Sequence, residues 1–238
     1  MPGKPLLLFD MDGTLIIPKV EAFNDKVSID VMGLQSRQQM KRVAVSYGVP
    51  QSKIDPINRM AVVWNFARGY AEAQGYSDEK ITSMMTGINE FFGRQEELEH
   101  SLSVLLPSTI ETLEALKSRY FVLGLVTTAS RKGFERISRI VEFGCFGRYF
   151  THSITRDDCK YIKPDPEPIS RMLRHLGRSD FLYIGDSDHD AEAAKAAGGR
   201  FILINTRPYD EEMKRKIQPD GVINRLSELP DLIPRIYK

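Results

Sequence analysis

Residues 5–15 read PLLLFDMDGTL, and this stretch decides the fold that we expect for the chain. Its first part is short, continuous and apolar, as buried parallel strands are. The run stops at Asp10, where two carboxylates stand two residues apart, and Gly13 permits a sharp turn and a close backbone approach to an anion. Asp10 is suited to nucleophilic attack and Asp12 to general acid–base catalysis. The alternative is that Asp12-Gly13 only forms a turn.

Further apolar runs of similar length follow after residue 105 and alternate with amphipathic stretches. The runs cover residues 120–126, 149–154, 181–184 and 201–204, with Val222-Ile223 as a short edge strand. The helical stretches between them cover residues 108–117, 131–142, 167–175 and 188–197. Alternation of strand and helix predicts an α/β fold with a doubly wound, Rossmann-like parallel sheet and right-handed crossovers.

Residues 16–100 break this alternation. Apolar residues recur there at three- and four-residue spacing over residues 35–47, 54–73 and 78–98, which is typical of amphipathic helices. Ser77 is placed to cap the last of these helices. We therefore expect a core formed by residues 1–15 and 101–238, and a helical insert at residues 16–100 without strands.

Composition excludes several classes of protein. The 238 residues include 33 Lys and Arg against 32 Asp and Glu, a formal net charge of +1, which provides no general basic field for nucleic acid or an anionic membrane. No apolar run approaches the ~18 residues of a membrane span. Two cysteines, Cys145 and Cys159, form neither a disulfide framework nor a zinc motif and fit a reducing compartment. We expect a cytoplasmic protein with no nucleic-acid or membrane partner.

Polar residues also follow the later strands, and in an open α/β sheet ligands bind beyond the carboxyl ends of the strands. Thr127-Thr128 follow the run at residues 122–126, where a hydroxyl and backbone N–H groups could hold a phosphoryl oxygen. Helix capping by Thr128 or Ser130 is the alternative. Lys163 lies in IKPDPEP, a stretch whose prolines stiffen the backbone, although a single lysine is most often a solvated surface charge.

The run at residues 181–184 leads into GDSDHD, residues 185–190. Asp186 and Asp190 are four residues apart, so both can face one side of a helix that begins near Ser187. Clustered carboxylates repel one another unless a cation lies among them, and a few hard oxygen ligands suit Mg²⁺. Helix capping is the alternative, and it is compatible with a metal site.

Taken in order, DMDGT, LVTT, the lysine of IKPDPEP and GDSDHD resemble the motifs of the haloacid dehalogenase superfamily. The resemblance implies Asp10 as nucleophile and Asp12 as acid/base and carbonyl ligand of Mg²⁺. It implies that Gly13, Thr127, Thr128 and Lys163 contact the phosphoryl group, and that Asp186 and Asp190 complete the metal site with Asp10 and Asp12. An aspartate at position 12 favours phosphoryl transfer over dehalogenation. The insert is similar to a C1-type cap, although Ile16-Ile17-Pro18 replaces the Asp-Ser pair of many relatives.

The resemblance predicts an Mg²⁺-dependent phosphatase that acts on a small phosphate monoester through an aspartyl phosphate. A phosphomutase of the β-phosphoglucomutase type and a catalytically silent phospho-ligand-binding protein are the alternatives. We expect a monomer or a weak homodimer. Cations of the insert that could reach a substrate anion, or else lie on solvated helix faces, are Arg37, Lys41, Arg42, Arg59 and Arg68.

Overall fold

The computed structural model describes residues 5–19, 26–206, 215 and 217–237. The chain divides into two compact units. The core unit contains residues 1–17, 104–159 and 163–238, and the helical unit contains residues 18–103 together with residues 160–162. The cap role predicted for the insert at residues 16–100 stays a prediction.

The core unit is built on a sheet of six parallel strands. Their order across the sheet is β5 (His152–Ile154), β4 (Val122–Val126), β1 (Leu6–Phe9), β6 (Phe181–Gly185), β7 (Arg200–Ile204) and β8 (Gly221–Ile223). The chain builds outward from β1 on one side through β4 and β5, and then on the other side through β6, β7 and β8. The predicted doubly wound parallel sheet is confirmed, and the direction of winding reverses at β1, beside which such folds bind ligands.

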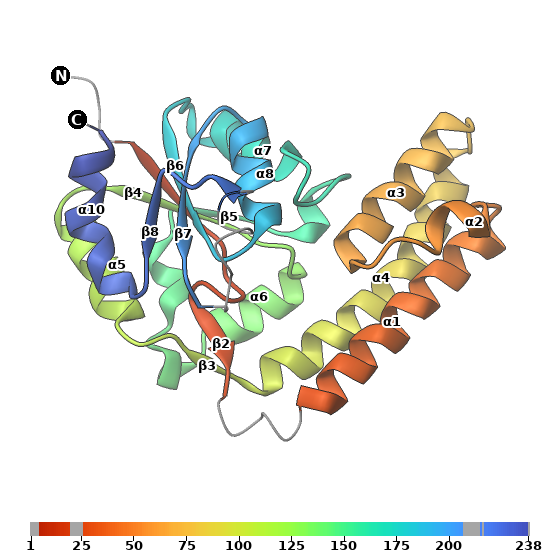
Figure 1. The fold of residues 1–238 in the computed structure, drawn as a ribbon, viewed down its shortest axis with the longest axis horizontal. Helices are drawn as coiled ribbons and strands as arrows, with labels where there is room; N and C mark the ends of the chain where they lie inside the picture. The colour runs from red at the N-terminus through yellow and green to blue at the C-terminus, as the bar shows by residue number, and fades with distance from the viewer. Residues whose placement is uncertain (1–4, 20–25, 207–214, 216, 238) are drawn as a thin grey trace. The chain divides into compact units, whose positions relative to one another are not determined.

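Helices cover both faces of this sheet (Figure 1). On one face α5 (Thr109–Ser118), α6 (Arg131–Ser138) and α10 (Leu229–Ile236) contribute to the same buried cluster as Leu7 and Phe9. On the other face α7 (Glu167–Leu176) and α8 (Asp188–Ala196) pack on Leu6 and Leu8. All four β1 side chains are fully buried, which explains why β1 is uniformly apolar and does not alternate.

The helical unit contains α1 (Lys26–Ser46), α2 (Gln51–Ile54), α3 (Met60–Ala73) and α4 (Asp78–Ser101). Ser77 caps α4 as predicted, since its side chain accepts a hydrogen bond from the Lys80 N–H. The prediction of a single helix over residues 54–73 was wrong. The chain leaves the helical conformation at residues 55–59, where Pro56 lacks the backbone N–H that a continuing helix needs.

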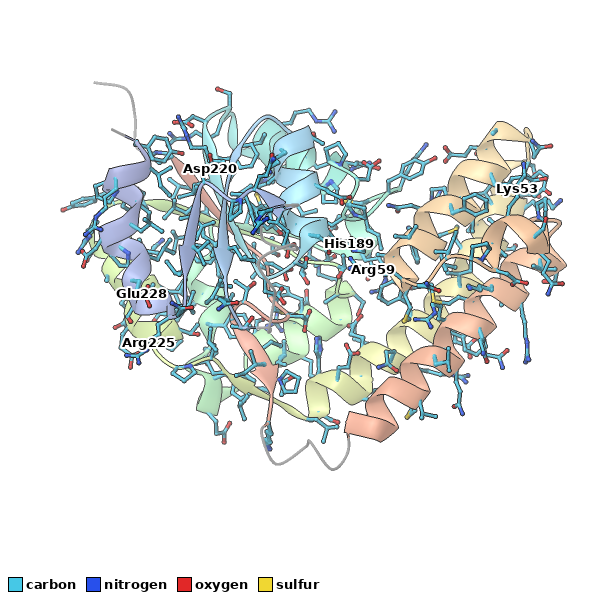
Figure 2. The ribbon with its side chains drawn as sticks, in the orientation of Figure 1. Lys53, Arg59, His189, Asp220, Arg225 and Glu228 are labelled. Atoms are coloured by element: carbon cyan, nitrogen blue, oxygen red, sulfur yellow. The ribbon has the colours of Figure 1, made fainter. Side chains whose placement is uncertain are left out.

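Two of the cations named from the sequence donate hydrogen bonds to carbonyl groups of residues 55–59, where the helix is interrupted. Arg37 donates to the carbonyl of Asn58 at 2.6 Å, and Lys41 donates to the carbonyl of Asp55 at 2.5 Å. Burial lowers the pKa of Lys41, assisted by the nearby Arg37. Lys53 lies on α2 (Figure 2). Arg37 and Lys41 therefore satisfy carbonyl groups that the interrupted helix leaves unbonded.

Two short strands were not expected. β2 (Ile16–Pro18) and β3 (Ser103–Leu105) pair with each other in a separate two-stranded sheet. Each has only three residues, too few for a periodic pattern to identify. The helix predicted over residues 131–142 ends at Ser138 and is followed by a 3-10 turn over Val141–Phe143. No helix in the described part of the chain combines the length and apolar character needed to cross a lipid bilayer.

Candidate active site

The carboxyl end of β1 presents Asp10 in a tightly turned loop. The Asp10 N–H donates to the carbonyl of Ile184 on β6 at 2.9 Å, which continues the parallel ladder by one residue. The N–H of Gly13 donates to the carbonyl of Ile16 at 2.7 Å, and Gly13 has a φ of +88°. A Cβ atom at Gly13 would lie 2.2 Å from Asp186 Oδ2. Glycine is therefore required at position 13 both by the turn and by the close approach of Asp186.

Lys163 lies at the centre of the site with its ammonium group buried. Nζ donates to Asp10 Oδ1 and to Asp190 Oδ1, both at 2.6 Å. It also contacts the Tyr183 hydroxyl at 2.8 Å and the carbonyl of Val126 at 3.1 Å. The side chain of Lys163 is 3% exposed, which excludes the alternative of a solvated surface charge, and its contact with a phosphoryl group stays a prediction.

Asp10, Asp186 and Asp190 form a carboxylate cluster. One oxygen from each lies within 4.8 Å of the others, and all three residues are buried. The helix that carries Asp190 begins as predicted. The Ser187 hydroxyl accepts from the Asp190 N–H at 3.2 Å, and Asp190 Oδ2 accepts from the Ser187 N–H at 3.1 Å. This reciprocal capping box fixes the other Asp190 oxygen toward Lys163. His189 lies on the same first turn of α8 (Figure 2).

Burial and neighbouring charges shift the pKa values of Asp10 and Lys163. Burial raises the pKa of Asp10 well above its ordinary value; Lys163 acts against this shift, and Asp190 and Asp186 add to it. Burial also lowers the pKa of Lys163, but Asp10 and Asp190 outweigh it and hold that pKa well above the ordinary value. Lys163 therefore remains a cation, and its ammonium group faces the buried carboxylates of Asp10 and Asp190.

A divalent cation fits this arrangement. The donors are buried carboxylate oxygens that lie within reach of one ion, and Mg²⁺ prefers such hard oxygen ligands. Asp10, Asp186 and Asp190 could hold such an ion. The carboxylate of Asp12 is not part of the three-residue cluster; the resemblance assigns its backbone carbonyl to the metal, and that assignment stays a prediction.

Thr127 and Thr128 follow β4 as expected, in a loop that hydrogen bonds connect to the rest of the core unit. Thr127 is buried, its N–H donates to the carbonyl of Ile154, and its hydroxyl accepts from the Ala129 N–H at 3.0 Å. The carbonyl of Thr128 accepts from Arg156 Nη1 at 2.5 Å. Ser130 is the residue that caps α6, accepting from Gly133, so Thr127 and Thr128 are not its cap.

The sequence analysis did not identify two residues of the site. Tyr183 lies inside β6, where it read as one more apolar strand residue, but its hydroxyl contacts Lys163 and donates to the carbonyl of Val126 at 2.8 Å. Thr206 lies just beyond β7, and its hydroxyl donates to the carbonyl of Gly13 at 2.6 Å. Its place after a strand at the functional edge of the sheet is a signal that could have identified it.

Comparison with known protein families identifies the chain. The model of the haloacid dehalogenase-like hydrolases matches residues 7–204. The chain belongs to this family. The matched range begins within β1 and ends with β7, so it includes all the residues of the cluster around Lys163.

Curated relatives of this haloacid dehalogenase-like hydrolase carry phosphatase names. Pyrophosphatase PpaX of Bacillus velezensis is 29% identical over 162 residues, which cover 67% of this chain and 72% of the relative. Phosphoglycolate phosphatase 1 of Pseudomonas aeruginosa is 27% identical over 241 residues, covering 96% of this chain and 78% of the relative. A solved structure from Haemophilus somnus, described as a predicted phosphoglycolate phosphatase, shares the fold with a TM-score of 0.57, 21% identity and coverage of 95% and 96%.

Proposed function

We propose that this chain is an Mg²⁺-dependent phosphatase that hydrolyses small phosphate monoesters through an aspartyl phosphate on Asp10. The observation that carries the proposal is the Asp10 carboxylate at the carboxyl end of β1, 2.6 Å from a buried ammonium and within a cluster of two further acids. Membership of a hydrolase family and two phosphatase relatives support it.

In the first half-reaction, a carboxylate oxygen of Asp10 attacks the phosphorus atom and the bond from phosphorus to the ester oxygen breaks. Asp12 gives its proton to the departing oxygen, which leaves as an alcohol. Lys163 balances negative charge between Asp10 and the incoming phosphoryl group, which would otherwise repel each other. Thr127 and the adjacent backbone hold phosphoryl oxygens.

In the second half-reaction, the Asp12 carboxylate takes a proton from a water molecule, whose oxygen attacks the phosphorus atom of the aspartyl phosphate. The bond between Asp10 and phosphorus breaks, inorganic phosphate leaves, and both carboxyl groups return to their starting states. Mg²⁺, held by Asp10, Asp186 and Asp190 and by the backbone carbonyl of Asp12, would supply charge neutralisation for the phosphoryl group.

The test is hydrolysis of p-nitrophenyl phosphate and a panel of phosphometabolites by the purified chain, with Mg²⁺ or with EDTA. The panel includes inorganic pyrophosphate and 2-phosphoglycolate, because relatives are named for activities on them. We expect Mg²⁺-dependent release of phosphate and a loss of several orders of magnitude in Asp10→Asn. The matched control is Asp231→Asn, an exposed carboxylate of the same unit. An inert wild type, or an Asp10→Asn variant with full activity, contradicts the proposal.

A further inference from the structure

Arg156 carries a guanidinium group that the core unit encloses. The residue is 1% exposed and is among the largest fully buried side chains of the described chain. A buried charge is costly unless it is hydrogen-bonded, and Arg156 Nη1 donates to the carbonyl of Thr128 at 2.5 Å. The backbone N–H of Arg156 donates to the carbonyl of Ala129 at 3.0 Å. Arg156 thus holds two consecutive carbonyl groups of the loop that follows β4.

The backbone of Arg156 is held by its own neighbours in the chain. Arg156 begins a 3-10 turn over Arg156–Asp158, and Thr155 stands before this turn as its cap. The N–H and the hydroxyl of Thr155 both donate to Asp158 Oδ2 at 2.8 Å. Arg131 Nη2, from the first residue of α6, donates to the same oxygen at 2.5 Å. The guanidinium group therefore extends from a braced segment and can hold the Thr128 carbonyl in place.

The bond to Thr128 sets the direction of the next N–H group along the chain. In a trans peptide unit, the carbonyl of one residue and the N–H of the next point in opposite directions. Arg156 binds the Thr128 carbonyl on one side, and on the other side the Ala129 N–H donates to Thr127 Oγ1 at 3.0 Å. This bond uses an accepting position of the Thr127 hydroxyl and leaves its single proton for another oxygen.

We propose that Arg156 is a positioning residue for phosphoryl transfer: through the Thr128–Ala129 peptide unit, it holds the Thr127 hydroxyl in the orientation that donates to a phosphoryl oxygen. This inference rests on the proposed phosphatase function, in which Thr127 contacts the phosphoryl group. Arg156 acts from within the core and needs no contact with substrate. The competing interpretation is that the buried guanidinium group only stabilises the folded core unit.

A substitution at Thr127 separates the two interpretations. Thr127→Val removes the hydroxyl while it keeps the shape of the side chain, and loss of one donor to a transition-state oxygen costs about 100- to 1000-fold in rate. We expect Arg156→Met to lower kcat/KM for p-nitrophenyl phosphate by about 10- to 100-fold when Thr127 is present. In the Thr127→Val background the same substitution should cost less than about threefold, because the hydroxyl that Arg156 orients is absent.

Rates are measured at saturating Mg²⁺, well below the unfolding midpoint, and divided by the folded fraction from circular dichroism. Arg119→Met is the matched control, because Arg119 Nη1 donates to the carbonyl of Pro230 at 2.7 Å, a bond of the same type at the end of α5. It should keep kcat/KM within about twofold. Arg156→Lys, whose ammonium group can still donate to the Thr128 carbonyl, serves if Arg156→Met does not fold. It should show a smaller fall that also shrinks in the Thr127→Val background.

An Arg156→Met or Arg156→Lys variant with wild-type kcat/KM per folded molecule overturns this inference and leaves the phosphatase function standing. An equal fall with and without Thr127→Val also overturns it, because the effect of Arg156 would then not pass through the hydroxyl. The same holds if Arg119→Met loses as much kcat/KM as Arg156→Met. An inert wild type overturns the proposed function and this inference together.

Discussion

Replacement of Lys163 by methionine should destabilise the protein strongly, because it removes the buried cation that contacts Asp10 and Asp190. The side chains involved are 3% exposed for Lys163, 8% for Asp10 and 1% for Asp190. Removing one partner of a buried ion pair costs about 3–5 kcal/mol, since the remaining charge is buried without compensation. Methionine nearly matches the length of the lysine stem, so the cavity left behind is small.

Proton uptake by the buried acids limits the destabilisation that Lys163→Met can cause. Burial already raises the pKa of Asp10, and the removal of Lys163 raises it further, so the cluster can bind a proton and relieve part of the repulsion. The Tyr183 hydroxyl also loses a hydrogen-bond donor, which adds about 1 kcal/mol. We therefore expect Lys163→Met to lower the free energy of unfolding by about 3–5 kcal/mol in EDTA at neutral pH.

Urea unfolding followed by circular dichroism measures this loss. Adding Mg²⁺ should restore part of the stability, because an ion that binds only the folded state stabilises it in proportion to the logarithm of its concentration. A second substitution, Asp10→Asn, should make Lys163→Met less costly by about 1–3 kcal/mol, since one of the repelling charges is gone. The exposed Lys132→Met serves as the control and should change stability by less than about 0.5 kcal/mol.

The explanation is refuted if Lys163→Met unfolds within about 1 kcal/mol of the wild type, or if its cost is the same with and without Asp10→Asn. Either result would mean that Lys163 does not balance the charge of Asp10 in the folded protein. The proposed role of this lysine in screening an incoming phosphoryl group would then lose its electrostatic basis.

Three other substitutions test separate features. Gly13→Ala places a Cβ atom 2.2 Å from Asp186 Oδ2 at a φ of +88°, so we expect a fall in kcat of at least about 100-fold and a loss of about 1–2 kcal/mol in urea unfolding. Tyr120 is 87% exposed with a φ of 62°, and Tyr120→Gly should stabilise the protein by about 0.5–1 kcal/mol in the same assay. Burial, and then His175, lowers the pKa of His152, so wild-type stability should be full above the unfolded pKa of about 6.5 and fall below it. His152→Asn should reduce the loss of stability between about pH 7.5 and 5.5.

The sequence predicted the parallel sheet well because β1, β6 and β7 are buried on both faces. Such strands are continuous apolar runs, and the runs of β1 and β6 ended where the motifs DMDGT and GDSDHD began. The short strands β2 and β3 gave no such signal, because three residues cannot show a period and their pairing joins segments more than eighty residues apart in sequence. The break between α2 and α3 could have been found, since Pro56 marks it.

For the candidate site, the sequence could predict which residues collect at one edge of the sheet but not how they share their charges. Asp10, Asp186 and Asp190 come together as their positions after β1 and β6 required. That Lys163 contacts two of these acids at once could not be predicted, because it lies 153 residues from Asp10 and 27 residues from Asp190 in the chain.

Tyr183 shows most clearly why such a site can be only partly predicted from a sequence. Its ring packs against Phe201 in the core, with centroids 6.4 Å apart, so the residue contributes to the apolar run of β6 as any aromatic residue would. Its hydroxyl accepts from Lys163 and donates to Val126, and burial raises its pKa well above the ordinary value, so it keeps the proton that it donates. Phenylalanine would give the same strand pattern. Only the buried ammonium group beside it makes the hydroxyl necessary, and that neighbour is twenty residues away in the chain.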